Sequence, residues 1–447
     1  MKNIILITIL IFAVNAKAQE TKSLTLRDAI TYALENKADA KKAKLKVENS
    51  EYQIQEVRSR ALPEISANGG LTYNPILQTT FLDAGSFGGE PGQTIEANFG
   101  QKWTSVAGVS LTQTLFDQTV FTGLKAARST REFYQINDQL TEEQVIERVA
   151  NNYYQVYVQR QRLNVLDSNY VNTNKVKNII KGQFDNGLAK KIDLDRILVK
   201  ISNINTQRQQ VLNAVQLQEN ALKFYIGMPI ETKITIPQTE FQVTPQAFSE
   251  APNTENRTEY LLLKKQEQLL TYQKKADEAA YYPTLSLTAG YNYIGQGPEI
   301  PWGGKPSDGV YWSDFSSVGL NLKVPIFKGF GTRAKVRQAD VNLRSLKEDI
   351  NDTKLSLDLA YENAKIQIDN SVITISNQKV NAQLAQDVLD NTRNNYIQGL
   401  ASLTDLLDAE NSLTEAQNNY TSAILDYKLA EIQLIKSKGE LKTLLNN

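Results

Sequence analysis

The chain has 447 residues, with 49 basic residues balancing 49 acidic ones, and it contains no histidine and no cysteine. Without histidine it lacks the usual general base, the imidazole metal ligand and the side chain that titrates near neutral pH, so an enzyme is disfavoured and no metal or cofactor is expected. A formal charge of zero, with both signs mixed along the chain, gives no case for binding nucleic acid.

The first residues have the pattern of an export signal. MKNIILITILIFAVNAKAQ carries an early lysine, an apolar run from Ile4 to Val14, and the small-x-small site Ala16-Lys17-Ala18. Residues 1–18 are therefore predicted to be a removed secretory signal. The apolar run is too short for a bilayer core of about 30 Å, and the absence of cysteine excludes lipidation at the cleavage site.

The rest of the chain is a tandem duplication. Residues 181–227 and 393–439 align throughout, both pass a Gly-Leu-Ala and both end on glycine, and Leu62-Pro63-Glu64-Ile65 recurs as Tyr282-Pro283-Thr284-Leu285. This predicts a first repeat at 19–227 and a second at 257–439, each with a helix, a strand pair, a long helix and a short helix. A proline-containing linker at 228–256 and a tail at 440–447 are expected to pack around the middle of the helices.

Helical patterns fill most of both repeats. The long segments, about 118–181 and 332–393, would each reach about 95 Å at 1.5 Å per residue, and shorter helices are expected near 25–60 and 188–225. From Leu406, large residues recur every seven positions to Leu434, with Ala409, Ala416, Ala423 and Ala430 at the second core position. This heptad pattern is typical of a coiled coil with close helix approach.

Two strand pairs interrupt the helices, near 65–73, 109–115, 285–293 and 318–324. Apolar and polar residues alternate along each, and the tryptophans Trp103, Trp302 and Trp312 lie in or beside them. Such aromatic-rimmed strands are typical of an outer-membrane β-barrel. The segments 82–102 and 296–313, rich in Gly, Pro, Asp and Ser, are expected to be solvent-exposed loops.

Four strands cannot close a barrel, and open edges in lipid would leave backbone groups unpaired at several kcal/mol each. A dimer would give eight strands, whose interior side chains fill, whereas a trimer gives twelve strands with room for water. The predicted fold is therefore an α+β membrane protein. It combines a tandem-duplicated barrel of long coiled-coil helices with a 12-stranded trimeric transmembrane β-barrel in contact with outer-membrane lipid.

The chain resembles the TolC-like outer-membrane efflux family. The resemblance rests on the junctions Thr114-Leu115-Phe116-Asp117 and Val324-Pro325-Ile326-Phe327-Lys328-Gly329, the segment VIERVANNYYQVYVQRQRL, and the tips Asn186-Gly187-Leu188-Ala189 and Gln398-Gly399-Leu400-Ala401. It implies a homotrimeric exit duct in the cell outer membrane, with its helices in the periplasm. The implied partners are a periplasmic adaptor and an inner-membrane pump of RND, ABC or MFS type, with cargo unspecified.

The resemblance also implies a periplasmic gate. Asp405 and Asp408 correspond to an acidic pair that would form a six-carboxylate ring in a trimer, and Asp193 and Tyr396 match positions that hold the entrance shut. A basic residue of that latch is replaced here by Ala401, so either Lys190 or Lys191 takes its place or the closed state is held less tightly. The alternative for the two aspartates is helix-terminal charge next to the cap residues Ser402 or Thr404.

Gly187, Leu188, Gly399 and Leu400 match the family's adaptor-contact motif. Glycine alone is explained by turn geometry, but a leucine repeated at two solvated tips suggests a partner. Two other classes compete with the channel. A periplasmic coiled-coil scaffold or adaptor explains the helices and the signal but not the strand pairs, and a carboxylate-based hydrolase lacks the α/β pattern that would form a pocket.

Overall fold

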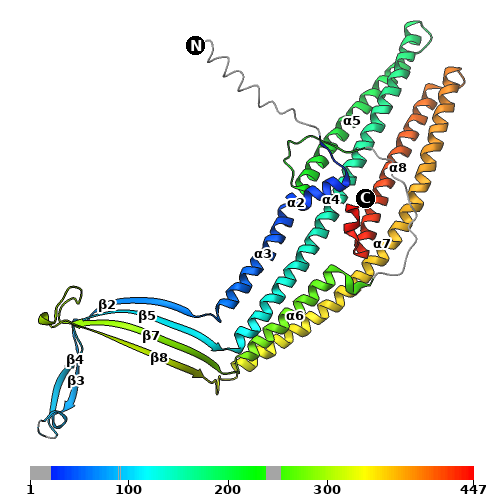
Figure 1. Ribbon diagram of the computed structural model, residues 1–447. Helices are drawn as coiled ribbons and strands as arrows, with labels where there is room; N and C mark the ends of the chain where they lie inside the picture. The colour runs from blue at the N-terminus through cyan, green and yellow to red at the C-terminus, as the bar shows by residue number, and fades with distance from the viewer. Residues whose placement is uncertain (1–21, 89, 91, 238–252, 447) are drawn as a thin grey trace, which may run out of the picture. The chain divides into compact units, whose positions relative to one another are not determined.

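The computed structural model describes residues 22–88, 90, 92–237 and 253–446 (Figure 1). The predicted signal at 1–18 lies outside these residues. The described chain forms two compact units. One comprises the described parts of Met1–Val47, Phe133–Lys264 and Lys347–Asn447, and the other comprises those of Glu48–Glu132 and Lys265–Leu346.

The same order of elements occurs twice along the chain. The first series is α2 (Leu26–Asn36), α3 (Ala38–Ser59), β2 (Glu64–Tyr73), β5 (Trp103–Phe116), α4 (Gln118–Asp185) and α5 (Lys191–Ile226). The second is α6 (Thr258–Ala279), β7 (Thr284–Gly297), β8 (Tyr311–Lys323), α7 (Gly331–Ile397) and α8 (Leu403–Lys438). The two long and two short helices expected after the strands are confirmed. No helix among the described residues is long and apolar enough to cross a membrane.

The single helix expected near 25–60 is wrong, because Lys37 divides it into α2 and α3. Lys37 has an extended backbone (φ −65°, ψ 133°), and its N–H donates to the carbonyl of Ala33. Its ammonium donates to the carbonyl of Phe224 at 2.9 Å and lies 3.8 Å from the centre of that ring. The break therefore brings the end of α2 against the end of α5, a contact between residues far apart in sequence.

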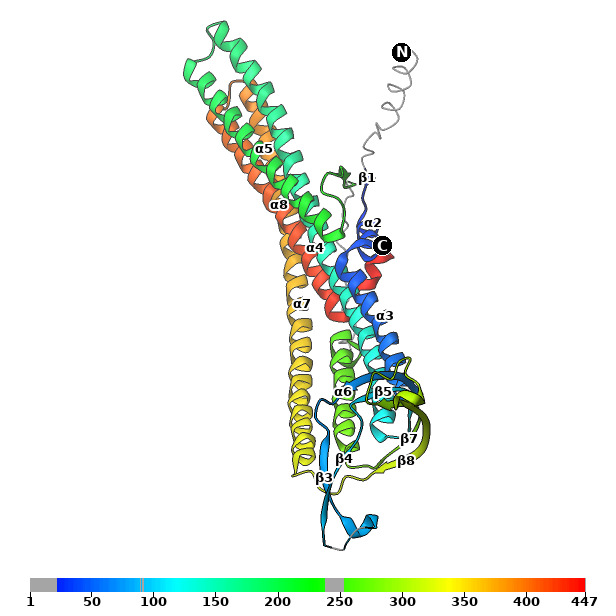
Figure 2. The same ribbon diagram turned by 90° about the vertical axis from the view of Figure 1, so that its left-hand side faces the viewer.

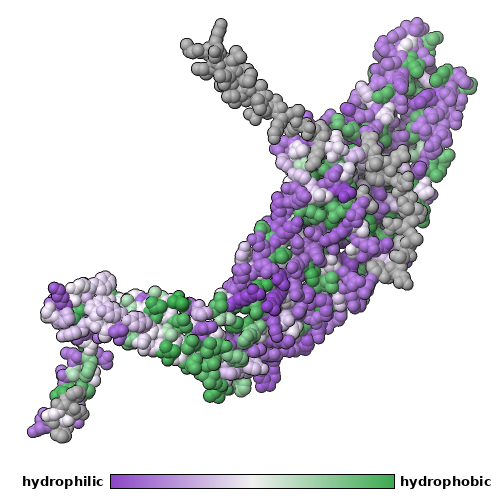
Figure 3. Space-filling model, viewed as in Figure 1, coloured by the Kyte–Doolittle hydropathy of each residue, from purple (hydrophilic) through white to green (hydrophobic). Residues whose placement is uncertain are grey.

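The second unit contains a four-stranded antiparallel sheet in the order β2-β5-β7-β8. The central pair joins the two repeats, with Val109 opposite Tyr291 and Phe116 opposite Leu285 after a bulge. Exposed apolar side chains alternate along β8 at Val318, Leu320 and Leu322, and Figure 3 shows apolar residues gathered over the strand ends that adjoin the helices. Such a face needs an apolar environment or a partner.

The expectation of loops at 82–102 and 296–313 is wrong in part. Residues 78–99 contain a hairpin of β3 (Gln78–Asp83) and β4 (Thr94–Phe99), separated by the short helix η1 (Ala84–Phe87). Strands β7 and β8 also extend a few residues into the second segment, and the connection between them, residues 298–310, includes the short helix η3 (Pro306–Asp308). These segments do contain turn-forming residues, but pairing between neighbouring strands also makes part of each segment β-strand.

The first unit has a hydrophobic core where α2, α4, α5 and α8 meet the short elements near the linker and the C-terminus. Strand β1 (Lys22–Ser23) pairs in parallel with β6 (Ile234–Thr235), and η4 (Leu441–Leu445) contributes Leu441 and Leu444 to the same core as Ile30 and Ile146. In α8 the predicted heptad positions Leu406, Leu413, Tyr427 and Leu434 are buried. Figures 1 and 2 show the paired helices α4, α5, α7 and α8 running side by side to two turns.

Candidate gate and partner-contact site

Each long helix ends in a glycine turn that leads into a shorter helix. Gly187 and Gly399 adopt left-handed backbone conformations, with φ of 73° and 77°. In both turns the following leucine N–H donates to the carbonyl five residues earlier, at 2.7 Å for Leu188 and 2.8 Å for Leu400. This is the Schellman pattern that stops a helix, so the turn role of the two glycines is confirmed.

The two leucines after these glycines remain in solvent. Leu188 is 81% exposed and Leu400 is 75% exposed. The hydrogen bonds that close each turn come from the backbone and do not require leucine at this position. Turn geometry therefore explains the glycines and leaves the repeated exposed leucines available for a partner.

Below the turns, the four helices share one apolar layer. Its buried members come from α4, α5, α7 and α8: Val176, Ile180, Ile197, Leu389, Leu403, Leu406, Ala409 and Leu413. The predicted gate residue Tyr396 packs half-buried against this layer. Because the layer joins both turns within one chain, a movement of one helix pair would have to break it.

The structure brings Tyr396 and Asp193 close together. Burial, and then the negative charge of Asp193, raise the pKa of the Tyr396 hydroxyl. Next to them, the Arg196 guanidinium donates to the hydroxyl of Thr404 at 3.2 Å, from α5 to the start of α8. Arg196 is thus a basic residue that links the two turns. It was not identified from the sequence, because only Lys190 and Lys191 were considered as replacements for the missing basic residue, and both of these lysines are exposed.

Asp405 has a defined local role, and Asp408 does not share it. The Ser402 N–H and hydroxyl both donate to Asp405 Oδ2 at 2.8 Å, and the Asp405 N–H donates back to Ser402 Oγ at 3.2 Å. This capping box starts α8, and these hydrogen bonds lower the pKa of the Asp405 carboxyl. Asp408, one turn further along α8, is exposed. The cap alternative therefore holds for Asp405, while both carboxylates stay at the exposed start of α8.

A polar cluster behind these residues was also missed. Glu410 is only 8% exposed and accepts a hydrogen bond from the Thr173 hydroxyl at 3.3 Å, and its Oε1 has no hydrogen-bond partner among the described residues. Burial raises the pKa of Glu410, although the charges of Lys200 and Arg393 oppose it. Lys200 also donates to Asn411. A single Glu on a heptad-patterned helix carries no signal of burial, since its exposure depends on the neighbouring helices.

Taken together, an exposed apolar sheet and long paired helices ending in charged, leucine-tipped turns define an outer-membrane channel protein. The chain belongs to the outer membrane efflux protein family, whose model, described as "Outer membrane efflux protein", matches residues 29–228 and 255–440. It is an outer-membrane exit duct of an efflux or secretion system, and the members of this family are channel-forming proteins. The alternative of a periplasmic scaffold is therefore wrong.

Curated relatives are similar over most of the chain. Outer membrane protein TolC of Vibrio cholerae is 24% identical over 349 residues, covering 75% of this chain and 76% of TolC. Outer membrane efflux protein BepC of Brucella suis is 22% identical over 452 residues, covering 98% of this chain and 91% of BepC. Alkaline protease secretion protein AprF of Pseudomonas aeruginosa is 24% identical over 432 residues, covering 93% and 84%.

Solved structures share the fold at lower sequence identity. VceC of Vibrio cholerae superposes with a TM-score of 0.72 at 16% identity, covering 93% of this chain and 96% of that one. CusC gives a TM-score of 0.73 at 17% identity, covering 93% and 92%. The predicted family resemblance is confirmed by the family model, which matches most of the chain, and these structures confirm the fold.

Proposed function

We propose that three copies of this chain assemble into one channel, with β2 of each copy pairing with β8 of the next. The proposal rests on the sheet order β2-β5-β7-β8, in which β2 and β8 each have one edge without a strand partner among the described residues. In lipid each unpaired backbone group costs several kcal/mol. The ten residues of β2 would therefore make an isolated chain very unfavourable in a membrane.

The number of copies follows from the space inside the barrel. Two copies would give eight strands, whose inward side chains fill the interior, and three give twelve strands with a water-filled interior. The helices would then continue the channel on the periplasmic side as a passive duct that catalyses no reaction. Asp405, Asp408, Asp193 and Tyr396 would form its entrance gate.

The duct would work with a periplasmic adaptor and an inner-membrane pump. The relatives include an efflux protein and a protein named for protease secretion. The proposal therefore includes an inner-membrane pump of RND, ABC or MFS type as the partner of the duct. Leu188 and Leu400, exposed at matching positions of the two turns, would contact the adaptor. The proposed adaptor contact is supported by the occurrence of an exposed leucine at the same position in both duplicated turns.

Cysteine cross-linking and native mass spectrometry test this assembly directly. The chain has no cysteine, so single cysteines placed along β2 and along β8 provide a clean background. Cross-links between a β2 cysteine in one copy and a β8 cysteine in another, together with three chains per particle in native mass spectrometry, are the expected result. A stable monomer that conducts ions in planar bilayers would refute the trimer.

A further inference from the structure

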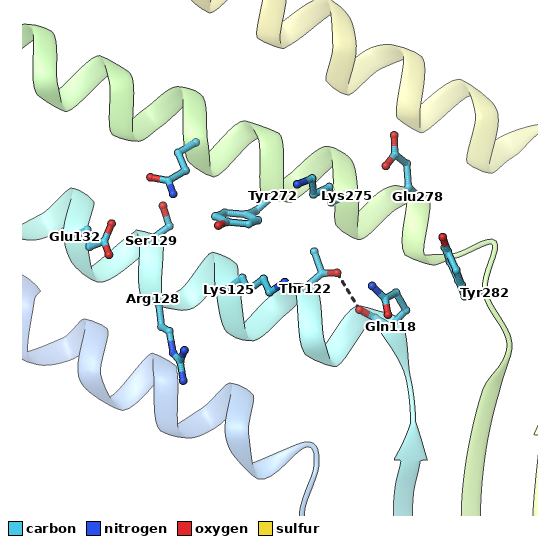
Figure 4. A pocket seen from close by; sticks show the side chains of 11 residues that line it. Gln118, Thr122, Lys125, Arg128, Ser129, Glu132, Tyr272, Lys275, Glu278 and Tyr282 are labelled. Atoms are coloured by element: carbon cyan, nitrogen blue, oxygen red, sulfur yellow. Dashed lines mark hydrogen bonds between the residues drawn. The ribbon is translucent and has the colours of Figure 1, made fainter.

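A large polar groove lies between α4 and α6, directly beside the strands. Its volume is about 630 Å³, and Figure 4 shows side chains of both helices pointing into it. It begins at Gln118, two residues after the end of β5, and at Tyr282, two residues before the start of β7. The groove therefore starts where the sheet ends.

Two lysines from different repeats lie at the same level in this groove. Phe116 and Leu285 form the last pair between β5 and β7, and Lys125 and Lys275 lie nine and ten residues beyond them (125 − 116 and 285 − 275). At 1.5 Å per helical residue this places both about 10–15 Å past the sheet. A polar headgroup layer extends roughly 5–8 Å beyond the hydrocarbon core, and a lysine side chain can extend back toward it.

Among the described residues, neither acidic side chain of the groove, Glu132 or Glu278, forms an ion pair with Lys125 or Lys275. Glu132 accepts from Lys265 at 2.7 Å. The hydrogen bond from Lys274 to Asp340, and then the charges of Asp340 and Glu278, raise the pKa of Lys274, so Glu278 acts on that neighbouring lysine. Lys125 and Lys275 form no ion pair with the described residues, which leaves two ammonium groups facing the groove.

The lining also offers uncharged donors. Ser129 is 2% exposed, and its hydroxyl has no hydrogen-bond partner among the described residues. Buried polar groups of this kind are usually satisfied by a water or a ligand. Tyr272 and Tyr282 line the same groove, and tyrosines favour the headgroup level of a membrane. Arg128 also lines the groove, and its side chain extends toward α3 (Figure 4).

We propose that this groove binds the phosphate of an anionic phospholipid headgroup in the leaflet next to the helices, held between Lys125 and Lys275. The inference deepens the proposed function, since it rests on the strands crossing the outer membrane. Two lysines match a diffuse anionic charge, and the tyrosines suit the glycerol and upper acyl region. The lipid would sit on the seam between the two repeats and so support the junction of β5 with β7.

Native mass spectrometry of the trimer extracted from nanodiscs with equal phosphatidylglycerol and phosphatidylethanolamine tests this. The wild type is expected to retain phosphatidylglycerol preferentially. Removing each lysine should lower that retention about five-fold, so Lys125→Gln/Lys275→Gln should lose nearly all of it. Lys335→Gln is the matched control, because this exposed lysine of α7 does not line the groove and its loss should leave retention unchanged.

Three results would overturn the proposal. Equal retention by the double variant and the wild type would remove the lysines from the site, and no preference in the wild type would remove the site itself. Displacement of the lipid by inorganic phosphate at the same concentration as by a soluble glycerophospholipid would assign the groove to free anions. Titrating phosphatidylglycerol into wild-type trimer decides the matter even if the variants fail to assemble. Conductance of the same samples reports separately on the channel, so a conducting protein without lipid preference refutes only this inference.

Discussion

Replacing Asp405 and Asp408 with Asn, singly and together, separates a cation filter from a helix cap. Asp405 receives two hydrogen bonds from Ser402, whereas Asp408 is exposed outside that capping box. If both carboxylates line the entrance, both single variants should lower cation selectivity. If Asp405 is only a cap, its replacement should lower the thermal midpoint by about 1–2 °C and leave selectivity unchanged, and Asp408→Asn should do neither.

The size of the effect follows from the charge on the blocking ion. One carboxylate about 4 Å from a monovalent cation in water enriches it roughly five-fold, and a trivalent cation roughly a hundred-fold, because the Coulomb energy scales with charge. Three copies of both residues would place six carboxylates at the entrance. The double variant should therefore raise the concentration of trivalent cation needed for half-block at least about a hundred-fold at low salt, and less as salt screens the charges.

Planar-bilayer recordings provide the assay, with the trivalent cation added on the helical side. The Ser402 hydrogen bonds lower the pKa of Asp405, whereas crowding of like charges in the trimer raises it. A depressed carboxyl pKa means that the folded-state advantage of ionised Asp405 is present above its unfolded pKa and is lost only as pH falls through the lower folded value. Wild-type selectivity and block in the double variant would refute the filter.

Three further predictions concern the turns and the packing of the helices. Leu188→Asp/Leu400→Asp should abolish efflux in cells while trimer yield and membrane insertion stay normal. Unimpaired efflux would show that neither leucine is needed for contact with the adaptor. Glu410→Gln should remove one contribution to the pH dependence of thermal unfolding. Because the folded pKa of Glu410 is raised, its contribution to stability is fully present in acid and falls as pH rises above the ordinary value of 4.5; an unchanged slope contradicts this. Gly227→Ala should destabilise by about 2 kcal/mol or more, since a Cβ would lie 2.9 Å from the last carbonyl of α2, whereas Gly399→Ala, with a similar φ of 77° and no atom within 4 Å, should cost about 1 kcal/mol. Equal losses in chemical unfolding of the two glycine variants would show that the close contact does not matter.

Local patterns carried most of the fold prediction. The heptads of α8, the alternation along β2 and β7, and the glycines at both turns depend on neighbours only a few residues away, and each appears where expected. The same reasoning failed at Lys37, which ends α2 and contacts Phe224, and at 78–99, where pairing between strands extends order into a glycine-rich segment. Both failures involve partners that local sequence does not identify.

The sequence by itself determined the duplicated order of elements, the length of the helices and the position of the leucine-tipped turns, because helical and strand periods are set by backbone geometry. Only the tertiary structure decided that β5 and β7 join the repeats, that Tyr396 lies near Asp193, that Arg196 reaches Thr404 and that Glu410 is buried. These features depend on which helix faces meet, and a side chain's charge, burial and pKa follow from that packing.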